Sequence, residues 1–510
     1  MRNTVITSAV REEAEKLVRR HQKYLSDLAA NIKRRETRAG ASIPKVMHFP
    51  EYWSANEGFN PYHVRSNANG IAYAIDKALA LGQYRPRPAA KYSVPKLDGS
   101  LREVSVFQIA DNAVSNLTFD RLIEKNGRHL SAHAYAYRRD LSVHDAVLHI
   151  VSDFHSKSRI FIAEFDFAKF FDSISHDHIR RILADKRFFL TERELKVIDA
   201  FLTAPSVAAK DYSQSNPPAR ERGIPQGTSI SLFLANVAAY PLDRKLEALG
   251  VGFARYADDT LIWGDSYDVV CRAVNALEEA ASEMGVEINF LKSEGISILC
   301  PDGAQAEFKA KSTVSFIGYD ISPTLISIRA RKIKEAKAWM SYLIFSNLLQ
   351  EPKRGNLLIA RLAYGIDRDY LVMLNQIRRY LYGGLGESQL RKYMARQTPL
   401  IRYQGLMSFY PIVNDEALLK SLDGWLLNSV YRALRLRGRL YRRAGITTLP
   451  PPHGMPKSGL LKLSYRPGPG QFVDMRFPSV ARISRLITRA SRTYGASAVA
   501  NVRSLRYYSS

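Results

Sequence analysis

The stretch that decides the fold is Phe253-Ala254-Arg255-Tyr256-Ala257-Asp258-Asp259-Thr260-Leu261-Ile262-Trp263. Apolar residues flank two adjacent carboxylates, which predicts a strand, a tight turn carrying Asp258 and Asp259, and a returning strand. An Asp-Asp pair alone also suits an ordinary solvated turn. Two neighbouring anions repel each other, however, and they favour a bound cation if further carboxylates lie nearby.

A third carboxylate ends another apolar segment, Ile160-Phe161-Ile162-Ala163-Glu164-Phe165-Asp166. If both segments are neighbouring strands of one sheet, Asp166 and Asp258 converge on a site for two divalent ions about 4 Å apart, as two-metal phosphoryl transfer requires. Hard oxygen ligands favour magnesium over zinc. The expected cofactor is therefore a pair of Mg²⁺ ions, with Mn²⁺ as a substitute.

These residues resemble the catalytic motifs of reverse transcriptases. Tyr256-Ala257-Asp258-Asp259 is similar to the catalytic hairpin, and Asp166 is similar to the metal ligand of the other palm strand. The resemblance implies an α+β fold of the right-hand polymerase type, with fingers and a palm built on antiparallel sheet, a helical thumb and a basic helical extension. The expected regions are an N-terminal helical and irregular extension at 1–90, fingers and palm at 91–330, thumb at 331–400 and basic C-terminal region at 401–510.

Basic residues precede the Asp166 segment. Asp98-Gly99 lies between two alternating segments over 92–106, which predicts a hairpin. In reverse transcriptases a fingers hairpin of this kind holds the triphosphate, and the resemblance gives this role to Lys96 and Arg102. A solvated basic hairpin is the alternative. Arg138, in a segment similar to a second fingers motif, is the predicted phosphate contact.

The resemblance also implies a nucleotide pocket behind Asp166. Phe171 matches the position that packs under the sugar and excludes a 2′-hydroxyl, so deoxynucleotides are the expected substrates. Phe167 is assigned to both the nucleotide and the metal site. The alternative for adjacent aromatic residues such as Phe170 and Phe171 is core packing. His176 and His178 are predicted to begin a helix and not to bind metal.

Further motifs follow in the order expected of a palm. Pro225-Gln226-Gly227 predicts a turn before a helix, and Gln226 and Gly227 are assigned to the nucleotide site. Lys292 is the candidate general acid for the departing pyrophosphate, with an ordinary surface lysine as the alternative. Tyr256, Phe316 and Gly318 are assigned to the primer strand.

The charge of the chain is concentrated in its last third. Residues 331–510 contain 31 Lys and Arg against 9 Asp and Glu, a net charge of +22, whereas residues 1–330 have a net charge of +3. Such a field indicates a polyanionic partner, and interleaved aromatic residues favour nucleic acid over a membrane. Arg435, Arg439 and Arg442 are the candidate contacts to the nucleic-acid backbone. Two cysteines and the lack of a long apolar run favour a cytoplasmic protein.

The combination of motifs is most similar to bacterial reverse transcriptases of the group II intron-like lineage, and within it to the abortive-infection and defence-associated (unknown-group) enzymes, type nine in particular. That resemblance implies antiviral DNA synthesis, dNTP substrates, a DNA product, a structured noncoding RNA as partner or template, and homo-oligomers. It also implies priming on a protein hydroxyl, for which Tyr507 and Tyr508 are the candidates. The alternatives are an intron maturase and a non-catalytic RNA-binding protein with a polymerase fold.

Overall fold

The computed structural model describes residues 3–95, 101–155, 157–185, 187–212, 217–289, 293, 295–363, 365–383, 385, 389, 392, 395, 403–466 and 473–499. The chain forms two compact units. Unit 1 consists of residues 1–25 and 47–312, and unit 2 consists of residues 26–46 and 313–510. Helix α1 (Asn3–Ala39) contributes to both.

The palm sheet of unit 1 is organised around strand β3, which pairs antiparallel with β6, β7 and β8. Its strand order is β5-β6-β3-β8-β9, with β7 beside β3. Side chains alternate between the faces of a strand. Phe165 and Phe167 of β3 therefore join the main core, whereas Glu164 and Asp166 lie on the opposite face. The strands are β3 (Ile160–Ala168), β5 (Gly252–Tyr256), β6 (Asp259–Gly264), β7 (Glu287–Ile288), β8 (Gly295–Leu299) and β9 (Ala310–Lys311).

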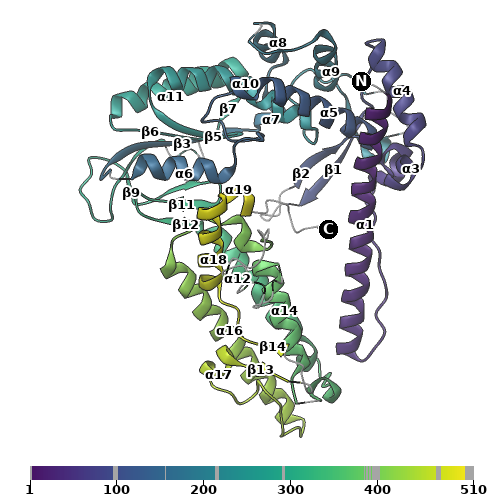
Figure 1. The fold of residues 1–510 in the computed structure, drawn as a ribbon, viewed down its shortest axis with the longest axis vertical. Helices are drawn as coiled ribbons and strands as arrows, with labels where there is room; N and C mark the ends of the chain where they lie inside the picture. Colours follow the sequence, from purple (N-terminus) through teal and green to yellow (C-terminus); the bar gives the residue numbers. More distant parts are fainter. Residues whose placement is uncertain are drawn as a thin grey trace. The chain divides into compact units, whose positions relative to one another are not determined.

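Helices α10 and α11 pack on the core face of this sheet (Figure 1). Helix α6 packs near β5 and β6 on the other face, where the Trp263 ring contacts Phe154 and the Trp263 indole N–H donates to Asp153 at 3.0 Å. Helix α6 thus covers part of the sheet face that carries Glu164 and Asp166. It covers the end of β6 at Trp263, whereas Asp166 pairs with the other end of β6, at Asp259. The unit 1 helices are α4 (Ala68–Ala80), α5 (Ile109–Asn126), α6 (Val143–Phe154), α7 (Phe170–Ser173), α8 (His176–Ala184), α9 (Glu192–Leu202), α10 (Ser229–Leu249) and α11 (Tyr267–Met284).

A second sheet contains the predicted fingers hairpin. Strands β1 (Ala89–Pro95) and β2 (Leu101–Val106) pair antiparallel, and β4 (Ser206–Ala208) adds to β1 in parallel. The N-terminal region at 1–90, expected to be helical and irregular, contains the short helices α2 (Tyr52–Ala55) and α3 (Pro61–Ser66). The Asn60 side chain caps α3 by accepting from Tyr62 N at 3.0 Å, and Pro61 is the first helical residue. Asn and Pro here begin a helix and do not interrupt one.

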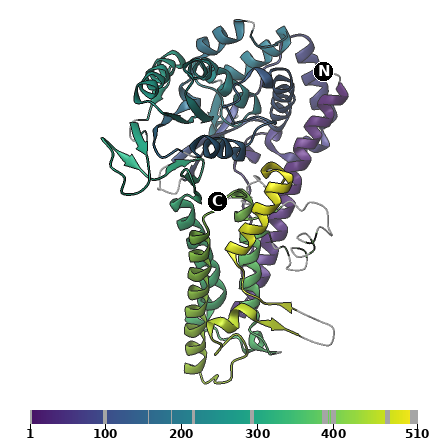
Figure 2. The same cartoon turned by 60° about the vertical axis from the view of Figure 1, so that its left-hand side comes forward.

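Unit 2 is mostly helical, and its long helices lie side by side (Figure 2). A small antiparallel sheet, β10-β11-β12, precedes them. The α+β prediction is confirmed. Among the described residues, no helix combines the length and apolar composition needed to cross a membrane. The elements are β10 (Val314–Phe316), β11 (Tyr319–Ile321), β12 (Ile326–Ile328), α12 (Ala330–Ile344), a π-helical turn η4 (Phe345–Leu349), α13 (Gln350–Lys353), α14 (Arg368–Tyr382), α16 (Glu416–Arg443), α17 (Lys457–Lys462), β13 (Ser464–Tyr465), β14 (Val473–Asp474), α18 (Val480–Tyr494) and α19 (Ala496–Val499).

Candidate active site

Two of the three predicted carboxylates stand directly opposite each other in the palm sheet. The register of β3 and β6 places Asp166 across from Asp259, and β5 returns beside β6 with Tyr256 across from Asp259. Directly opposed residues share a face, with Cβ atoms about 5 Å apart. Asp258 precedes Asp259 in the turn, after Ala257 with φ 59°. The fold therefore brings residues more than ninety positions apart in the sequence to one end of one sheet.

The carboxylates at this site are not arranged as the ligands of a metal ion. Among the residues that the structure describes, no group of three or more His, Cys, Asp or Glu is arranged to hold a metal ion. Asp166 Oδ2 accepts a hydrogen bond from the Asn289 side chain at 3.2 Å, and Asn289 N donates to Asp166 O at 2.8 Å. The available donors are carboxylate and amide oxygens, which suit Mg²⁺. The two-ion site stays a prediction.

A buried ion pair lies directly behind the Asp258-Asp259 turn. Arg255, on β5, is completely buried, and its guanidinium donates to both carboxylate oxygens of Asp243 on α10 at 2.7 and 2.6 Å. It also donates to Ala257 O at 3.3 Å, inside the turn itself. Burial raises the pKa of the Asp243 carboxyl, while the charge of Arg255 lowers it. Arg255 therefore fixes the turn to the helix behind it.

The same network reaches the second fingers motif. Asn236 of α10 accepts from Arg255 at 3.4 Å and donates to Ala136 O at 2.9 Å. The backbone of Arg255 accepts from Tyr135 N and donates to His133 O, both at 2.9 Å. Sequence analysis assigned no role to Arg255, Asn236 or Asn289. The available signal was an arginine in the middle of a buried, apolar strand, which requires a buried acidic partner.

Aromatic rings line the surroundings of the carboxylates. The Tyr137 ring centroid lies 6.4 Å from those of Phe171 and Tyr256. Phe171 is half-buried, whereas Phe167 and Phe170 are buried in the core and stack at 5.5 Å. Of the adjacent aromatic pair, Phe170 is thus a packing residue, and Phe171 is the one that is partly exposed.

The Pro225-Gln226-Gly227 turn contacts the fingers hairpin. Gly227 has φ 97°, and a Cβ there would lie 2.4 Å from Ser105 O on β2, so no other residue fits without displacing the strand. Gln226 donates to the Asp172 carboxylate at 3.1 Å. Helix α10 begins two residues after Gly227 and continues through Pro241. The turn is therefore held between the hairpin and the segment that follows Asp166.

The remaining predicted residues of unit 1 either contact the protein itself or lie outside the described part. The Arg138 side chain is 5% exposed, and it donates to Ser131 O at 2.5 Å and to the Asp140 carboxylate. It braces its own loop in this arrangement, and its contact with phosphate stays a prediction. His176 and His178 lie in the first turn of α8 and bond to backbone carbonyls of Gly223 and Ala238. The residues or side chains that lie outside the described part are Lys96, the Arg102 side chain, Lys292, Tyr507 and Tyr508.

In unit 2, a tight hairpin turn joins β10 to β11, with Phe316 just before the turn and Gly318 within it. Ile317 and Gly318 both have positive φ, at 46° and 85°, as a two-residue hairpin turn requires. A β-branched residue in that region is strained. The Phe316 side chain is buried, and the Gly318 carbonyl accepts from Arg329 N at 3.1 Å. Their contact with a primer strand stays a prediction.

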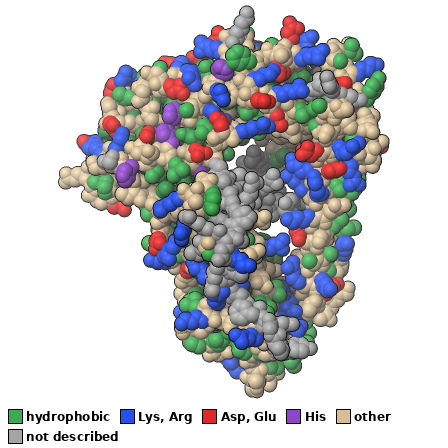
Figure 3. All heavy atoms as spheres, viewed as in Figure 1, with side chains coloured by type: hydrophobic (Ala, Val, Ile, Leu, Met, Phe, Trp, Pro, Cys, Tyr) green, Lys and Arg blue, Asp and Glu red, His purple; other side chains and the backbone are tan. Residues whose placement is uncertain are grey.

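The arginines in the second half of α16, at positions 432–443, point to different sides of the helix. Four of its exposed arginines follow the spacing of one helix face: Arg432, Arg435, Arg439 and Arg442. Arg437 faces the opposite way, is completely buried, and donates to Asp367 and Asp369 at 2.8 Å each. Arg437 is therefore a structural residue, whereas the contact of Arg435, Arg439 and Arg442 with nucleic acid stays a prediction. Lys and Arg are more frequent than acidic side chains on the visible surface around α14 and α16 (Figure 3).

The ion cluster around Arg437 predicts acid sensitivity. Burial would raise the pKa of Asp367, but hydrogen bonds and charge from His453 and Arg437 hold it at about 2, below the ordinary 3.8. A lowered folded-state pKa stabilises the fold at pH above about 4, and this contribution of about 2 kcal/mol is lost as the pH falls toward 2. The free energy of unfolding, measured with urea at a series of pH values, should fall between about pH 4 and about pH 2. The slope of this fall should be smaller in Asp367→Asn. Asp302→Asn, in unit 1, serves as the control and should keep the slope.

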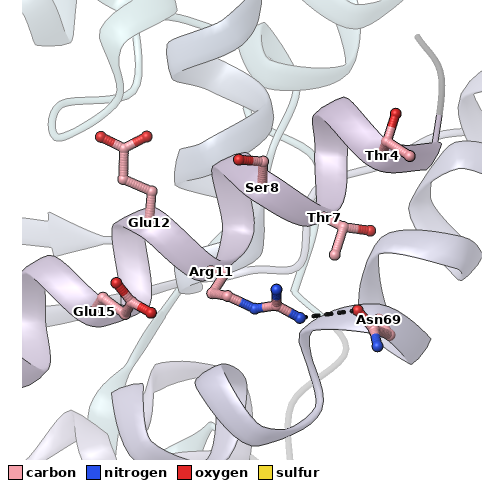
Figure 4. A pocket seen from close by; sticks show the side chains of 7 residues that line it. All are labelled: Thr4, Thr7, Ser8, Arg11, Glu12, Glu15 and Asn69. Carbon is pink, nitrogen blue, oxygen red and sulfur yellow. Dashed lines mark hydrogen bonds between the residues drawn. The ribbon is translucent and has the colours of Figure 1, made fainter.

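A sizeable cavity lies away from the carboxylates. It has a volume of about 640 Å³ and lies on the N-terminal part of α1, where Arg11 donates to Asn69 at 3.1 Å (Figure 4). Its other lining residues are Thr4, Thr7, Ser8, Glu12 and Glu15. Because these residues include no predicted catalytic or nucleotide-binding residue, the site stands on the sheet geometry and not on this cavity.

Comparison with known protein families matches residues 94–321 to the family described as reverse transcriptase (RNA-dependent DNA polymerase). The chain contains a reverse transcriptase domain. The match runs from the end of β1 through both carboxylate strands to the β10-β11 hairpin.

Curated relatives share this domain at modest identity. The chain is 26% identical over 180 residues to the putative COX1/OXI3 intron 1 protein of Saccharomyces cerevisiae, covering 34% of this chain and 20% of that protein. It is 26% identical over 223 residues to the retron Mx162 reverse transcriptase of Myxococcus xanthus, covering 39% of this chain and 44% of that enzyme. The chain thus spans less than half the length of these relatives.

Among solved structures, the chain is similar to telomerase from Candida albicans, solved with the TWJ fragment of telomeric RNA. The TM-score is 0.37 at 13% identity, covering 71% of this chain and 63% of that one. A telomerase from Candida tropicalis without its C-terminal domain gives a TM-score of 0.37 at 12% identity, covering 52% of this chain and 60% of that one.

Proposed function

We propose that this protein is an RNA-directed DNA polymerase that adds dNTPs to a primer. The observation that carries the proposal is the register that sets Asp166 opposite Asp259, with Asp258 in the adjoining turn, inside a reverse transcriptase domain. Asp166, Asp258 and Asp259 would hold two Mg²⁺ ions, which in such sites activate the attacking hydroxyl and stabilise charge on the transferred phosphoryl group. The Arg255 network would keep these carboxylates in place.

The test is extension of a labelled primer on matched RNA and DNA templates. We expect incorporation of dNTPs on the RNA template, abolished by a chelator and restored by adding Mg²⁺. Activity on the DNA template alone would contradict the assignment of RNA as template. Absence of incorporation on both templates would favour a non-catalytic RNA-binding protein.

Phe171 is proposed to exclude ribonucleotides. Its half-buried ring lies beside Tyr137 and close in sequence to Asp166. Removing the ring in Phe171→Ala should open space for a 2′-hydroxyl and reduce the preference for dCTP over CTP by about tenfold to a hundredfold. The measurement is kcat/KM for each nucleotide on the same primer-template. Phe170→Leu, a change in the core behind it, should lower stability and leave the preference unchanged.

We further propose a role in antiviral defence, as the resemblance to defence-associated enzymes implies, with a structured noncoding RNA as template and partner. Homo-oligomers, action in the cytoplasm, type nine membership and priming on Tyr507 or Tyr508 belong to the same proposal. Sequencing the RNA and DNA that co-purify with the protein tests the template. Protein-linked DNA that disappears in Tyr507→Phe/Tyr508→Phe would support priming, and its persistence in that variant would exclude it.

A maturase is the second candidate, and the similarity to a yeast intron-encoded protein favours it. A maturase acts on the intron that encodes it. Intron sequence flanking the gene, together with splicing that is stimulated by the purified protein, would support this candidate over the defence role.

A further inference from the structure

An exposed aromatic strip runs along α12 into the π-helical turn that follows it. Trp339, Tyr342 and Phe345 are 45%, 56% and 42% exposed, although the helix buries its other face through Ile333, Ala336, Met340, Leu343 and Ile344. A spacing of three residues makes each of these residues a neighbour of the next along the helix surface. Three large apolar side chains close together on an exposed helix surface indicate an interaction site.

Two of the rings in this strip, those of Trp339 and Tyr342, form a platform. The Trp339 and Tyr342 centroids are 5.2 Å apart with planes tilted by 30°, close to parallel. The ring centroid of Tyr380, on α14, lies 6.4 Å from that of Trp339. Phe345 begins the five-residue π-helical turn Phe345–Leu349, an irregularity that is common at functional sites.

The platform lies in a cationic setting beside a shallow pocket. Lys353 Nζ lies 5.5 Å from the centre of the Phe345 ring. Phe345, Leu349 and the exposed Arg432 line a pocket of about 240 Å³ between η4 and α16, together with Ser341, Ile344, Ser429, Ala433 and Leu436. An apolar pocket of this size with a guanidinium in its wall suits a planar base attached to a phosphate.

We propose that the strip of Trp339, Tyr342 and Phe345 binds an unpaired segment of single-stranded nucleic acid. Successive bases stack on the rings, and Lys353 and Arg432 neutralise the phosphates. Charge selects this occupant, because residues 331–510 have a net charge of +22, and exposed rings interleaved with cations are the usual surface for unpaired bases. The inference rests on the proposed function only in assuming that unit 2 meets nucleic acid.

The test is binding of a fluorescent 12-nucleotide single strand, as RNA and as DNA, to the full chain by anisotropy. Each Ala substitution in the strip should weaken binding about tenfold, and Trp339→Ala/Tyr342→Ala/Phe345→Ala should weaken it more. An RNA duplex of the same sequence should bind the wild type and the triple variant equally, because the bases of a duplex are already stacked on one another. Comparing the RNA and DNA arms identifies which single strand the strip prefers.

Tryptophan fluorescence gives a second readout that does not depend on activity. Single-stranded RNA should quench the wild type and not Trp339→Phe, which keeps a ring for stacking and should retain its affinity. The matched control is Tyr73→Ala/Phe189→Ala, two aromatic residues of unit 1 that are 63% and 60% exposed, and it should bind as the wild type does. The circular dichroism and melting temperature of every variant should match the wild type, because the residues are exposed.

Unchanged single-strand affinity in the triple variant would overturn the proposal. So would a change in oligomeric state on removing the strip, which would identify it as a protein contact. Failure of the strip is separable from failure of the polymerase proposal, because primer extension on a short, fully paired primer-template needs no unpaired segment.

Discussion

Asp258→Asn is expected to abolish nucleotide incorporation, with kcat lowered by about a thousandfold or more. Asn keeps the size of the side chain but removes the negative charge that would hold a divalent ion. The turn that carries Asp258 is fixed by Arg255 and by pairing of β5 with β6, so the fold should be unchanged. The measurement is the steady-state rate of dNTP addition on an RNA template with saturating Mg²⁺, with melting temperature measured in parallel.

Asp268→Asn is the matched control. Asp268 lies on α11, is 78% exposed, and pairs only with Arg272 of the same helix among the ion pairs of the described residues. It should retain the wild-type rate. A wild-type rate in Asp258→Asn would mean that this carboxylate takes no part in catalysis, and the proposed polymerase site would then have to be abandoned.

Arg255→Leu is expected to cost about 3–5 kcal/mol of the free energy of unfolding, because it leaves the buried Asp243 without its partner. The same change removes the donor to Ala257 O, so the Asp258-Asp259 turn loses its support and kcat should fall as well. Urea unfolding measures the first effect and primer extension the second.

The double variant Arg255→Leu/Asp243→Leu separates stability from positioning. Replacing both charges with apolar residues should restore much of the lost stability, and the coupling follows from the double-mutant cycle. Activity should stay low, because an apolar side chain in place of Arg255 cannot donate to the turn. Recovery of both stability and activity in the double variant would show that Arg255 acts on the fold alone.

The palm could be predicted from sequence because its signals are local. Alternating apolar residues predict the strands around Asp166 and Asp258, and a turn between two such runs predicts the hairpin. The choice of partner between distant elements, in contrast, leaves no signal in the local sequence. The pairing of Arg255 with Asp243 spans twelve residues and two elements, so an arginine within an apolar strand indicates that a buried acid is needed but does not indicate which acid it is.

Helical phase explains why Arg437 is buried although the other arginines of α16 near it are exposed. The composition of the α16 run indicated only that it is basic, whereas the spacing of its arginines already separates Arg437 from the four that share an exposed face. Asn60 and Pro61 show the opposite problem. Both are typical of loops, and only the apolar residues that follow, such as the buried Val64, reveal that they begin a helix.

The position of β3 between two neighbours limits how the length of this protein can vary. Because β6 pairs along one edge and β8 along the other, a residue inserted between Ile160 and Asp166 could not bulge outward from a free edge. It would exchange the two faces, sending a carboxylate into the core and a phenylalanine to the surface. Insertions and deletions among homologues should therefore collect in the connecting loops and leave this strand at constant length.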